Sequence, residues 1–231
     1  MKAYVAEVRT IAEGTLACTL VPEAPFAFQA GQFVELAIAS PRHTDARGSA
    51  RMLSIASAPG EPVLTFATRT STSAFKRSLA ALRPGDVCVL SAPGGAFVRQ
   101  PDTRPHVLIA GGVGITPVRA IVRAMLRDEP RVPVAVVHLN RNPRSAPFFD
   151  EFVAAARARS WLVYHPVFDE GGGEGAQGPA DAAWFTRHLP DLAASWAYVV
   201  GPPPMVQAIG RVLDALEVPP AQRVLENFAG Y

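Results

Sequence analysis

The sequence is poor in cysteine and lysine. Its two cysteines, Cys18 and Cys88, lie far apart and form no Cys-x-x-Cys pair, which excludes a thiolate-bound iron–sulfur cluster or a four-cysteine zinc site. We therefore predict no metal site, and any redox centre has to be a bound organic cofactor. Lys2 and Lys76 are the only lysines, whereas alanine, arginine and proline are abundant. This bias weakens each single arginine as evidence for a phosphate ligand.

Long apolar runs and an excess of charge are also missing. No stretch of about 18 uninterrupted apolar residues occurs, and Met1–Arg9 alternates polar and apolar residues where a signal peptide would have a hydrophobic block. We therefore expect a cytoplasmic protein without a membrane span. The formal net charge is +2 and the arginines form no basic block, so nucleic acid is not an expected partner. No feature of the sequence indicates an oligomeric state.

The first part of the chain contains short alternating or β-rich runs, which are typical of strands. These runs are Val5–Thr10, Leu16–Val21, Phe33–Ile38 and Val63–Thr68. One helix is predicted over Ser73–Leu82, where Phe75, Leu79 and Leu82 recur at helical spacing before Pro84. The pattern predicts a small antiparallel β-barrel with one short helix.

From His106 onward the rhythm changes to strands that alternate with helices. The predicted strands are His106–Ala110, Val132–Leu139, Trp161–Phe168, Ala197–Val200 and Arg223–Asn227. The predicted helices are Pro117–Arg127, Pro147–Arg159, Ala180–Leu189 and Pro204–Leu216. Such alternation predicts an α/β domain with a parallel five-stranded sheet covered on both faces.

The change of rhythm places a domain boundary near Arg99–Pro105. We therefore predict a barrel domain over residues 1–100 and an α/β domain over residues 101–231. A glycine-rich stretch, Gly171–Gly178, interrupts the second domain, and we expect it to be a surface loop rather than a phosphate cradle.

The strongest signal in the sequence is a predicted strand that ends in a glycine-rich turn before a helix. Gly111, Gly112 and Gly114 allow backbone torsions and close approach that a side chain would forbid. Thr116 suits the N-cap and Pro117 the first helical position, so the free N–H groups of that helix would point back at the turn. A helix end of this kind attracts a pyrophosphate.

An ordinary strand-to-helix turn, with glycine present for close packing, is the alternative, because the match is not the G-x-G-x-x-G dinucleotide fingerprint. A second turn supports the binding interpretation. In Tyr198–Met205 another predicted strand runs into Gly201 and Pro202 before a helix. Two such turns on one parallel sheet form a crevice at its carboxyl edge, where ligands of these sheets bind. We expect the Met205 side chain to pack in the core.

Four segments, in the same order along the chain, resemble the motifs of the ferredoxin–NADP reductase superfamily. They are Arg51-Met52-Leu53-Ser54, Ser73–Lys76 with Pro84–Asp86, Gly111–Pro117, and Gly201-Pro202 with Glu226–Tyr231. The resemblance covers nearly the whole chain. It implies an FAD-dependent NAD(P)H oxidoreductase without a fused iron–sulfur domain.

The resemblance assigns flavin contacts to residues of the barrel. It implies that Arg51 pairs with the flavin phosphate, that Ser54 hydrogen-bonds the reactive nitrogen edge of the ring, and that Met52 and Leu53 lie beside the cofactor. An arginine fork suits a phosphate, and a small hydroxyl fits against the ring. The residues alone are equally compatible with an outward-facing pair, Arg51 and Ser54, on a strand. Ser73 resembles a second phosphate contact, which a simple helix N-cap explains equally well.

The sequence departs from the family pattern at two positions. Leu53 stands where the family has an aromatic residue stacked on the flavin, and Val200 stands where a cysteine usually precedes Gly-Pro. We expect slower hydride transfer but the same mechanism, because the cofactors carry the reactive atoms. Tyr231 is either an aromatic cover for the flavin face or a frayed chain end. Glu226 is either a participant in proton movement or a surface carboxylate.

The resemblance implies that NAD(P)H binds across the Gly111–Thr116 turn and Gly201, with its nicotinamide over the flavin. The flavin would take up a hydride and pass electrons to a separate acceptor such as ferredoxin or flavodoxin. Two alternatives remain open. The first is that the chain is the reductase component of an oxygenase. The second is that it is a flavin- or nucleotide-binding subunit that does not turn over alone.

The end of the second strand of the parallel sheet bears on the choice between NADPH and NADH. An acidic residue there favours a free ribose, and an arginine favours a 2′-phosphate. Leu139–Arg144 contains Arg141 and Arg144 and no acid, which favours NADPH, with Arg141 as the expected ligand.

Overall fold

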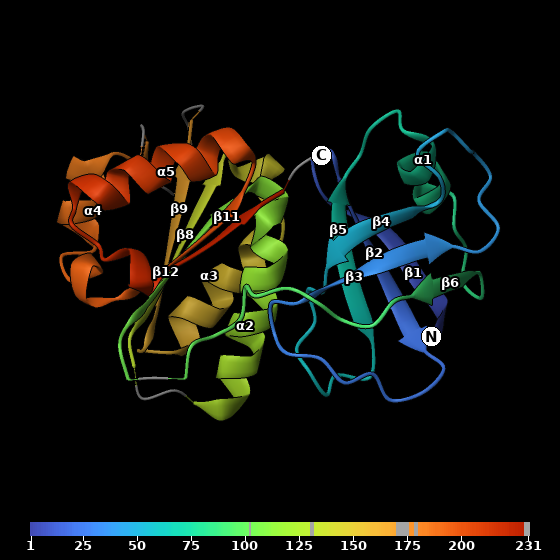
Figure 1. Ribbon diagram of the computed structural model, residues 1–231, viewed down its shortest axis with the longest axis horizontal. Coiled ribbons are helices and arrows are strands. Elements are labelled where there is room, and N and C mark those ends of the chain that lie inside the picture. Colours follow the sequence, from blue (N-terminus) through green and yellow to red (C-terminus); the bar gives the residue numbers. More distant parts are fainter. Residues whose placement is uncertain (102, 130–131, 170–175, 178–179, 229–231) are drawn as a thin grey trace.

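The computed structural model describes residues 1–101, 103–129, 132–169, 176–177 and 180–228. Two β-sheets lie side by side, one built from the first part of the chain and the other from the second (Figure 1). Within these ranges, none of the helices combines the length and the apolar character that a membrane crossing requires.

The first sheet is an antiparallel barrel. Its strands are β1 (Lys2–Ala12), β2 (Thr15–Pro22), β3 (Phe33–Ile38), β4 (Ala50–Ser54), β5 (Leu64–Arg69) and β6 (Val87–Leu90), in the order β4-β3-β6-β1-β2-β5. The barrel closes where the chain after β4 meets β5: Ile55 bridges Phe66, and the Ala56 N–H donates to the Thr65 carbonyl at 2.7 Å. The predicted barrel is therefore confirmed.

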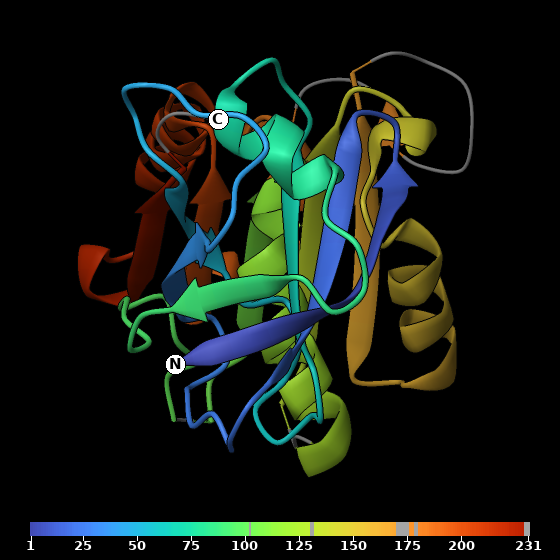
Figure 2. The ribbon, with the colours of Figure 1, turned by 90° about the vertical axis from the view of Figure 1, so that its right-hand side faces the viewer.

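The barrel interior is filled by alternating strand residues and by the helix α1 (Ala74–Ala80), which covers one end of the barrel (Figure 2). Phe75 and Leu79 of α1 are buried in this core. Both cysteines lie there too, and burial raises the pKa of Cys18 to about 12 and that of Cys88 to about 11. The two thiols therefore stay protonated and unreactive near neutral pH.

The second sheet is parallel throughout. Its strands are β7 (His106–Gly111), β8 (Val134–Asn140), β9 (Leu162–Phe168), β10 (Ala176–Gln177), β11 (Trp196–Gly201) and β12 (Arg223–Asn227), in the order β10-β9-β8-β7-β11-β12. Five of these are the predicted strands, and the two-residue β10 extends the edge beside β9. β10 falls inside the predicted loop Gly171–Gly178, and the rest of that loop lies outside the described residues.

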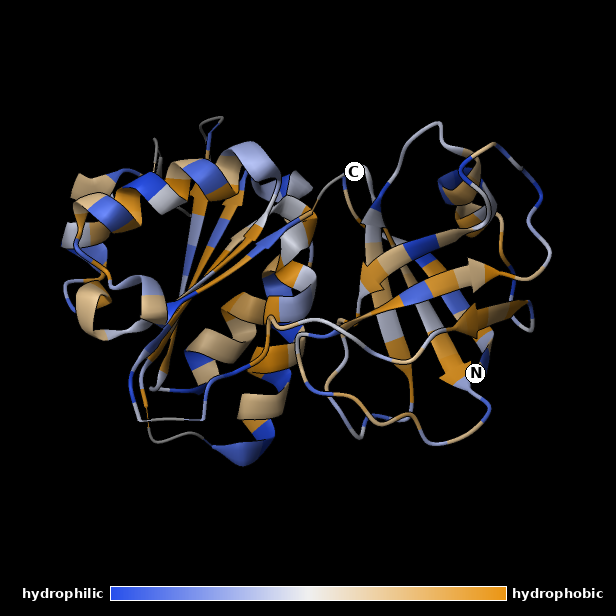
Figure 3. Cartoon of the chain, viewed as in Figure 1, coloured by the Kyte–Doolittle hydropathy of each residue, from blue (hydrophilic) through white to orange (hydrophobic). Residues whose placement is uncertain are grey.

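Helices cover both faces of the parallel sheet, as predicted. They are α2 (Ile115–Asp128), α3 (Phe149–Ala158), α4 (Ala182–His188) and α5 (Pro203–Ala215). Apolar residues of α2 and α3 pack with one set of strand residues, and those of α4 and α5 pack with the alternate set. Figure 3 shows hydrophobic residues along the inner strands, whereas α5 alternates between hydrophobic and hydrophilic positions. Burial of these faces stabilises the α/β half.

Helix α2 lies between the two sheets (Figure 1) and makes polar contacts across their boundary. The Arg119 guanidinium donates to the Ala56 carbonyl at 2.7 Å, and Arg123 forms an ion pair with Glu61 at 2.6 Å. Gly31, with φ of +101°, packs so tightly that a Cβ there would overlap the carbonyl oxygen of Phe97 and lie 3.2 Å from Cδ1 of Ile121 in α2. The two halves are thus in close contact, and the predicted division into residues 1–100 and 101–231 stays a prediction.

The predicted elements agree with the structure to within a few residues, but the start of α2 is different. Gly112–Gly114 forms a turn of 3₁₀ helix that continues directly into α2, so Gly114 is the N-cap. Thr116 already lies in the first turn, where its hydroxyl donates to the Val113 carbonyl at 3.0 Å. The prediction of Thr116 as N-cap and Pro117 as first helical residue is therefore wrong. The helical turn already begins at the glycines, before Thr116, and no side chain caps it.

Gly114 sets the distance between α2 and β11. A Cβ at this position would lie 2.6 Å from the Val200 carbonyl oxygen, so Gly114→Ala forces the helix away from the strand. We expect a loss of about 1–3 kcal/mol in the free energy of unfolding, measured by urea denaturation. Gly210→Ala in α5 is the matched control, since a Cβ there meets nothing within 4 Å and alanine favours the helix. Equal stability of the two variants would contradict this packing role.

Candidate functional site

A cavity of about 470 Å³ opens at the carboxyl ends of the parallel strands. Gly111 and Gly112, at the end of β7, line it together with Pro202 and Met205, which follow β11. The structure thus brings the two predicted glycine turns together in one crevice. This is the edge at which open parallel sheets bind their ligands.

The glycines at this edge have different tasks. Gly112 has φ of +53°, and a Cβ there would meet nothing within 4 Å, so it presents bare backbone to the cavity. A Cβ on Gly111 would collide with the Met205 sulfur. A Cβ on Gly201 would lie 3.0 Å from the Cε of the same methionine. Close packing therefore explains Gly111, Gly114 and Gly201, and the open position is that of Gly112.

Among the described residues that line this cavity, Thr116 is absent. The residue is 1% exposed, and its hydroxyl is used inside the turn. Met205 is part of the core as predicted, and it also lines the cavity.

Charged residues of both signs lie at the far end of the same cavity. Arg141, after β8, lines it, and its role as a cofactor ligand stays a prediction, whereas Arg144 lines a different cavity beside Arg9. Asp169, after β9, joins Arg141, and its backbone N–H donates to the Asn140 carbonyl at 3.1 Å. Asp169 was not predicted as part of the site, because it follows a different strand from the one whose end carries Arg141. Of the arginine pair that favoured NADPH, only Arg141 lines this cavity, together with the acid Asp169 and with Arg69 of the barrel.

A second cavity, of about 300 Å³, lies between the barrel and β12. Met52 and Ser54 of β4 line it from one side, and Glu226 of β12 lines it from the other. Phe228, which follows β12, lines both this cavity and the one at the glycine turns. Its N–H donates to the Gly201 carbonyl at 2.9 Å, which ties it to the second turn. The two cavities therefore adjoin at one aromatic residue, which the sequence analysis did not single out.

The polar residues Ser54, Glu226 and Asn227 line the second cavity. Ser54 is 6% exposed, and Glu226 is half-buried. Burial raises the pKa of Glu226 from 4.5 to about 7, so its carboxyl exchanges a proton near neutral pH. An acid poised in this way can give or take a proton inside the cavity.

Arg51 lies in a cationic environment near α1. Its guanidinium donates to the carbonyls of Arg47 and Gly48 at 2.9 and 3.1 Å and lies 5.2 Å from the centre of the Phe75 ring. The buried Nη2 makes no hydrogen bond within the described part of the chain, although an Asp45 carboxylate oxygen lies 4.0 Å away. A buried donor of this kind is suited to an anion.

Neighbouring cations strengthen that environment. Burial, and then Arg69, Arg51 and Arg47 in that order, lower the pKa of Lys76. Several cations held this close together favour an anionic ligand. Ser73 caps α1, since its hydroxyl accepts from the Lys76 N–H at 3.4 Å, so the N-cap interpretation holds and a phosphate contact stays a prediction.

The remaining predicted residues are placed as follows. Leu53 is 2% exposed in the barrel core, whereas its neighbour Met52 is 48% exposed at the second cavity. Val200 is fully buried within the α/β core. Tyr231 lies outside the described residues.

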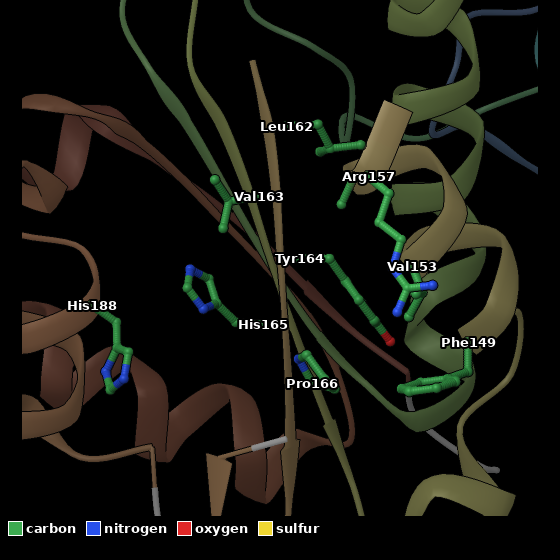
Figure 4. Close-up of a pocket in the computed structure, with 10 residues that line it drawn as sticks. Phe149, Val153, Arg157, Leu162, Val163, Tyr164, His165, Pro166 and His188 are labelled. Atoms are coloured by element: carbon green, nitrogen blue, oxygen red, sulfur yellow. The ribbon is translucent and has the colours of Figure 1, made fainter. Parts of the chain in front are cut away.

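A larger cavity, of about 680 Å³, lies along β9 between α3 and His188 of α4 (Figure 4). Figure 4 shows Tyr164 on one side of β9 and His165 on the other. None of the predicted site residues lines this cavity. Residues of three of the four motif segments line the two smaller cavities that meet at Phe228, whereas Arg51 and Ser73 line neither of them.

The raised pKa of Glu226 has a measurable consequence for stability. A charged carboxylate is disfavoured in the folded protein, so stability that is present below pH 4.5 is lost as the pH rises to about 7. Glu226→Gln removes this loss. In urea denaturation, we expect the free energy of unfolding of the variant minus that of the native protein to increase as the pH rises from 4.5 to about 7. A difference that does not vary with pH would contradict the burial of this group.

Comparisons with known proteins agree with this geometry. A family model described as the oxidoreductase NAD-binding domain matches residues 108–211. Ferredoxin–NADP reductase B of Sorangium cellulosum is 32% identical over 183 residues, which are 77% of this chain and 71% of that protein. A flavohemoprotein of Deinococcus radiodurans is 27% identical over 218 residues, which are 87% of this chain and 52% of that protein. The chain thus spans about half the length of the flavohemoprotein.

A solved structure extends the likeness to both sheets. The cytochrome P450 reductase GcoB of Amycolatopsis is 28% identical, with a TM-score of 0.86 that covers 99% of this chain and 70% of the other. The fold of both sheets is therefore shared with a known reductase. The chain belongs to the ferredoxin–NADP reductase family.

Proposed function

We propose that this chain oxidises NADPH or NADH through a bound FAD and delivers the electrons to a separate acceptor. The observation that carries the proposal is the meeting of two cavities at Phe228. One has bare glycine backbone at the carboxyl edge of a parallel sheet, and the other has Ser54 and Glu226 between the barrel and β12. Two rings that react with each other need two adjoining sites of this kind.

The residues of the barrel fit a flavin nucleotide. The buried Nη2 of Arg51, together with the cations that lower the pKa of Lys76, suits the diphosphate, with Ser73 at the start of α1 as a second contact. The ring would then lie towards Met52 and Ser54, at the second cavity. Residues 1–100 would form the flavin-binding domain in this arrangement.

The first cavity fits a nicotinamide dinucleotide. The open backbone of Gly112 precedes the long helix α2, whose first N–H groups attract a pyrophosphate. Gly111 and Pro202 would flank the nucleotide, and Arg141 would face its adenosine end. Residues 101–231 would form the dinucleotide-binding domain.

A bound flavin would supply the redox chemistry, two-electron exchange with a nicotinamide and one-electron exchange with an acceptor, and the residues of the chain would hold and orient it. The chain supplies orientation, which contributes about 7–11 kcal/mol in favourable cases by holding two reactants in contact. Ser54 supplies a hydroxyl at the wall of the second cavity, and Phe228 lies in the wall that the two cavities share. Glu226, with its pKa near 7, holds or releases a proton there.

The acceptor we propose is a ferredoxin or flavodoxin, in keeping with the reductase of Sorangium cellulosum. A role as the reductase component of an oxygenase is the second candidate. The likeness to a cytochrome P450 reductase over 99% of this chain favours it. Both candidates use the same flavin and dinucleotide sites and differ only in the partner protein.

The proposal is tested with purified protein saturated with FAD and freed of excess cofactor. We expect retained visible flavin absorbance, its rapid loss on anaerobic addition of NADPH or NADH, and turnover with ferricyanide. Unchanged colour with both nucleotides would favour a binding subunit that does not turn over alone. Failure to retain FAD or FMN would overturn the proposal as a whole.

Arg51→Ala makes this test specific to the barrel site. We expect flavin affinity to fall by about tenfold or more, because charge-assisted hydrogen bonds contribute about 1.5–3 kcal/mol. Arg77→Ala, which changes an exposed arginine of α1, is the matched control and should retain flavin. A panel of ferredoxin, flavodoxin and a cytochrome P450 then separates the two candidate acceptors.

The charges at the far end of the first cavity predict how the protein distinguishes NADPH from NADH. Arg141→Ala should lower kcat/KM for NADPH by about tenfold and leave NADH nearly unchanged, because only NADPH carries the 2′-phosphate. Asp169→Asn should shift the ratio in the opposite direction, since it removes a negative charge from the same cavity. Arg144→Ala is the matched control. Parallel changes for both nucleotides would contradict this assignment.

A further inference from the structure

His138 is a polar residue buried in the middle of the parallel sheet. It is fully buried on β8, between Ala110 of β7 and Pro166 of β9. Two residues earlier on the same face of the strand, Val136 belongs to the apolar core under α2 and α3. An imidazole in such a place is costly unless both ring nitrogens have hydrogen-bonding partners.

Both ring nitrogens of His138 do have partners. Nε2 lies 3.0 Å from the Gly112 carbonyl oxygen, and Nδ1 lies 3.0 Å from the Tyr164 hydroxyl. Burial lowers the pKa of His138 to about 4, so the ring is neutral near pH 7 and has a single N–H. A carbonyl oxygen can only accept, so Nε2 carries the hydrogen and donates to Gly112. Nδ1 is then an acceptor, and the Tyr164 hydroxyl donates to it.

The tyrosine that fixes this tautomer is itself held in place. The Tyr164 ring stacks on Phe152 of α3 at a centroid distance of 5.3 Å and an interplanar angle of 20°. Burial raises the pKa of Tyr164, so its hydroxyl keeps the proton that it donates. The chain of contacts thus runs from a helix on the sheet, through Tyr164 and His138, to the glycine turn.

The Gly112 carbonyl is the point where this chain reaches the first cavity. It also accepts the N–H of Ile115 at the start of α2, so two donors hold it in one direction. In a trans peptide the carbonyl and the following N–H point in opposite directions, and the described residues contain no cis peptide. The Val113 N–H therefore points away from His138, where Gly112 and Val113 line the cavity.

We propose that His138 is a positioning residue for dinucleotide binding: its Nε2–H, set by the Tyr164 hydroxyl, fixes the Gly112–Val113 peptide so that the Val113 N–H faces the pyrophosphate. This inference rests on the proposed function, because it assumes that the first cavity receives a nicotinamide dinucleotide. His138 touches neither reacting ring. Its effect belongs to nucleotide affinity rather than to the hydride step.

The test compares His138→Leu with His138→Gln in the full chain saturated with FAD. Leucine removes the donor to Gly112, whereas glutamine retains an N–H at a similar distance along the side chain. We expect His138→Leu to raise both KM for NADPH or NADH and the calorimetric Kd of the oxidised dinucleotide by about three- to tenfold, the value of one hydrogen bond. We expect kcat at saturation to change by less than about twofold and His138→Gln to recover most of the affinity.

Two further variants separate positioning from core packing. Tyr164→Phe keeps the stacked ring and removes the hydroxyl, so we expect the same direction of change with a smaller size. This variant decides the outcome if His138→Leu does not fold. His165→Leu is the matched control, because this neighbouring histidine leaves β9 on the opposite side from Tyr164 (Figure 4) and is expected to leave nucleotide affinity unchanged.

The outcomes distinguish this inference from the proposed function. If the native protein binds no dinucleotide, the proposed function fails. If the native protein binds the dinucleotide and His138→Leu binds it equally well, only the role of His138 is overturned. Where His138→Leu does not fold, equal binding by Tyr164→Phe overturns it in the same way. Equal losses in His138→Leu and His138→Gln would also overturn it, since the retained N–H would then have no effect.

Discussion

The close approach of two strand-to-helix turns is the constraint on which the candidate site depends. Gly114 lies against the Val200 carbonyl, and Gly111 lies against Met205, so the ends of β7 and β11 can come together only where side chains are missing. The same approach leaves Gly112 facing open space with a left-handed backbone. It also brings the Gly201 carbonyl to the N–H of Phe228, the residue shared by the two cavities. One packing requirement therefore determines where both sites lie.

Helix α2 transmits this arrangement to the barrel. It begins at the glycine turn, and one turn later Arg119 donates to the Ala56 carbonyl, two residues beyond Ser54. Arg119 also pairs with Glu151 of α3 at 2.8 Å, which limits the freedom of its side chain. The glycine turn and the strand with Ser54 are thus joined by a single helix and one short hydrogen bond. A reaction between two bound rings depends strongly on such fixed distances.

The sequence could predict those features that follow from local patterns. Alternating apolar residues predicted the barrel, strand and helix periods predicted the parallel sheet, and glycines at strand ends predicted the crevice. Long-range contacts were out of reach. Asp169 and Arg141 line one cavity only because β9 lies beside β8, and Phe228 reaches both cavities only because β12 pairs with β11. The cap at Thr116 was predicted wrongly because a glycine turn can begin a helix without a side-chain cap.

The two departures from the family pattern are absorbed by packing. Leu53 points into the barrel core and Val200 into the α/β core, where an aliphatic side chain fills space without an unsatisfied polar group. The surfaces at the second cavity come from other residues, with Met52 on β4 and Phe228 after β12. Met52 offers a flexible, polarisable contact, and Phe228 offers a flat one. The walls that face the proposed flavin therefore do not require the missing aromatic residue or the missing thiol, and the geometry of the cleft is kept by the glycines and by α2.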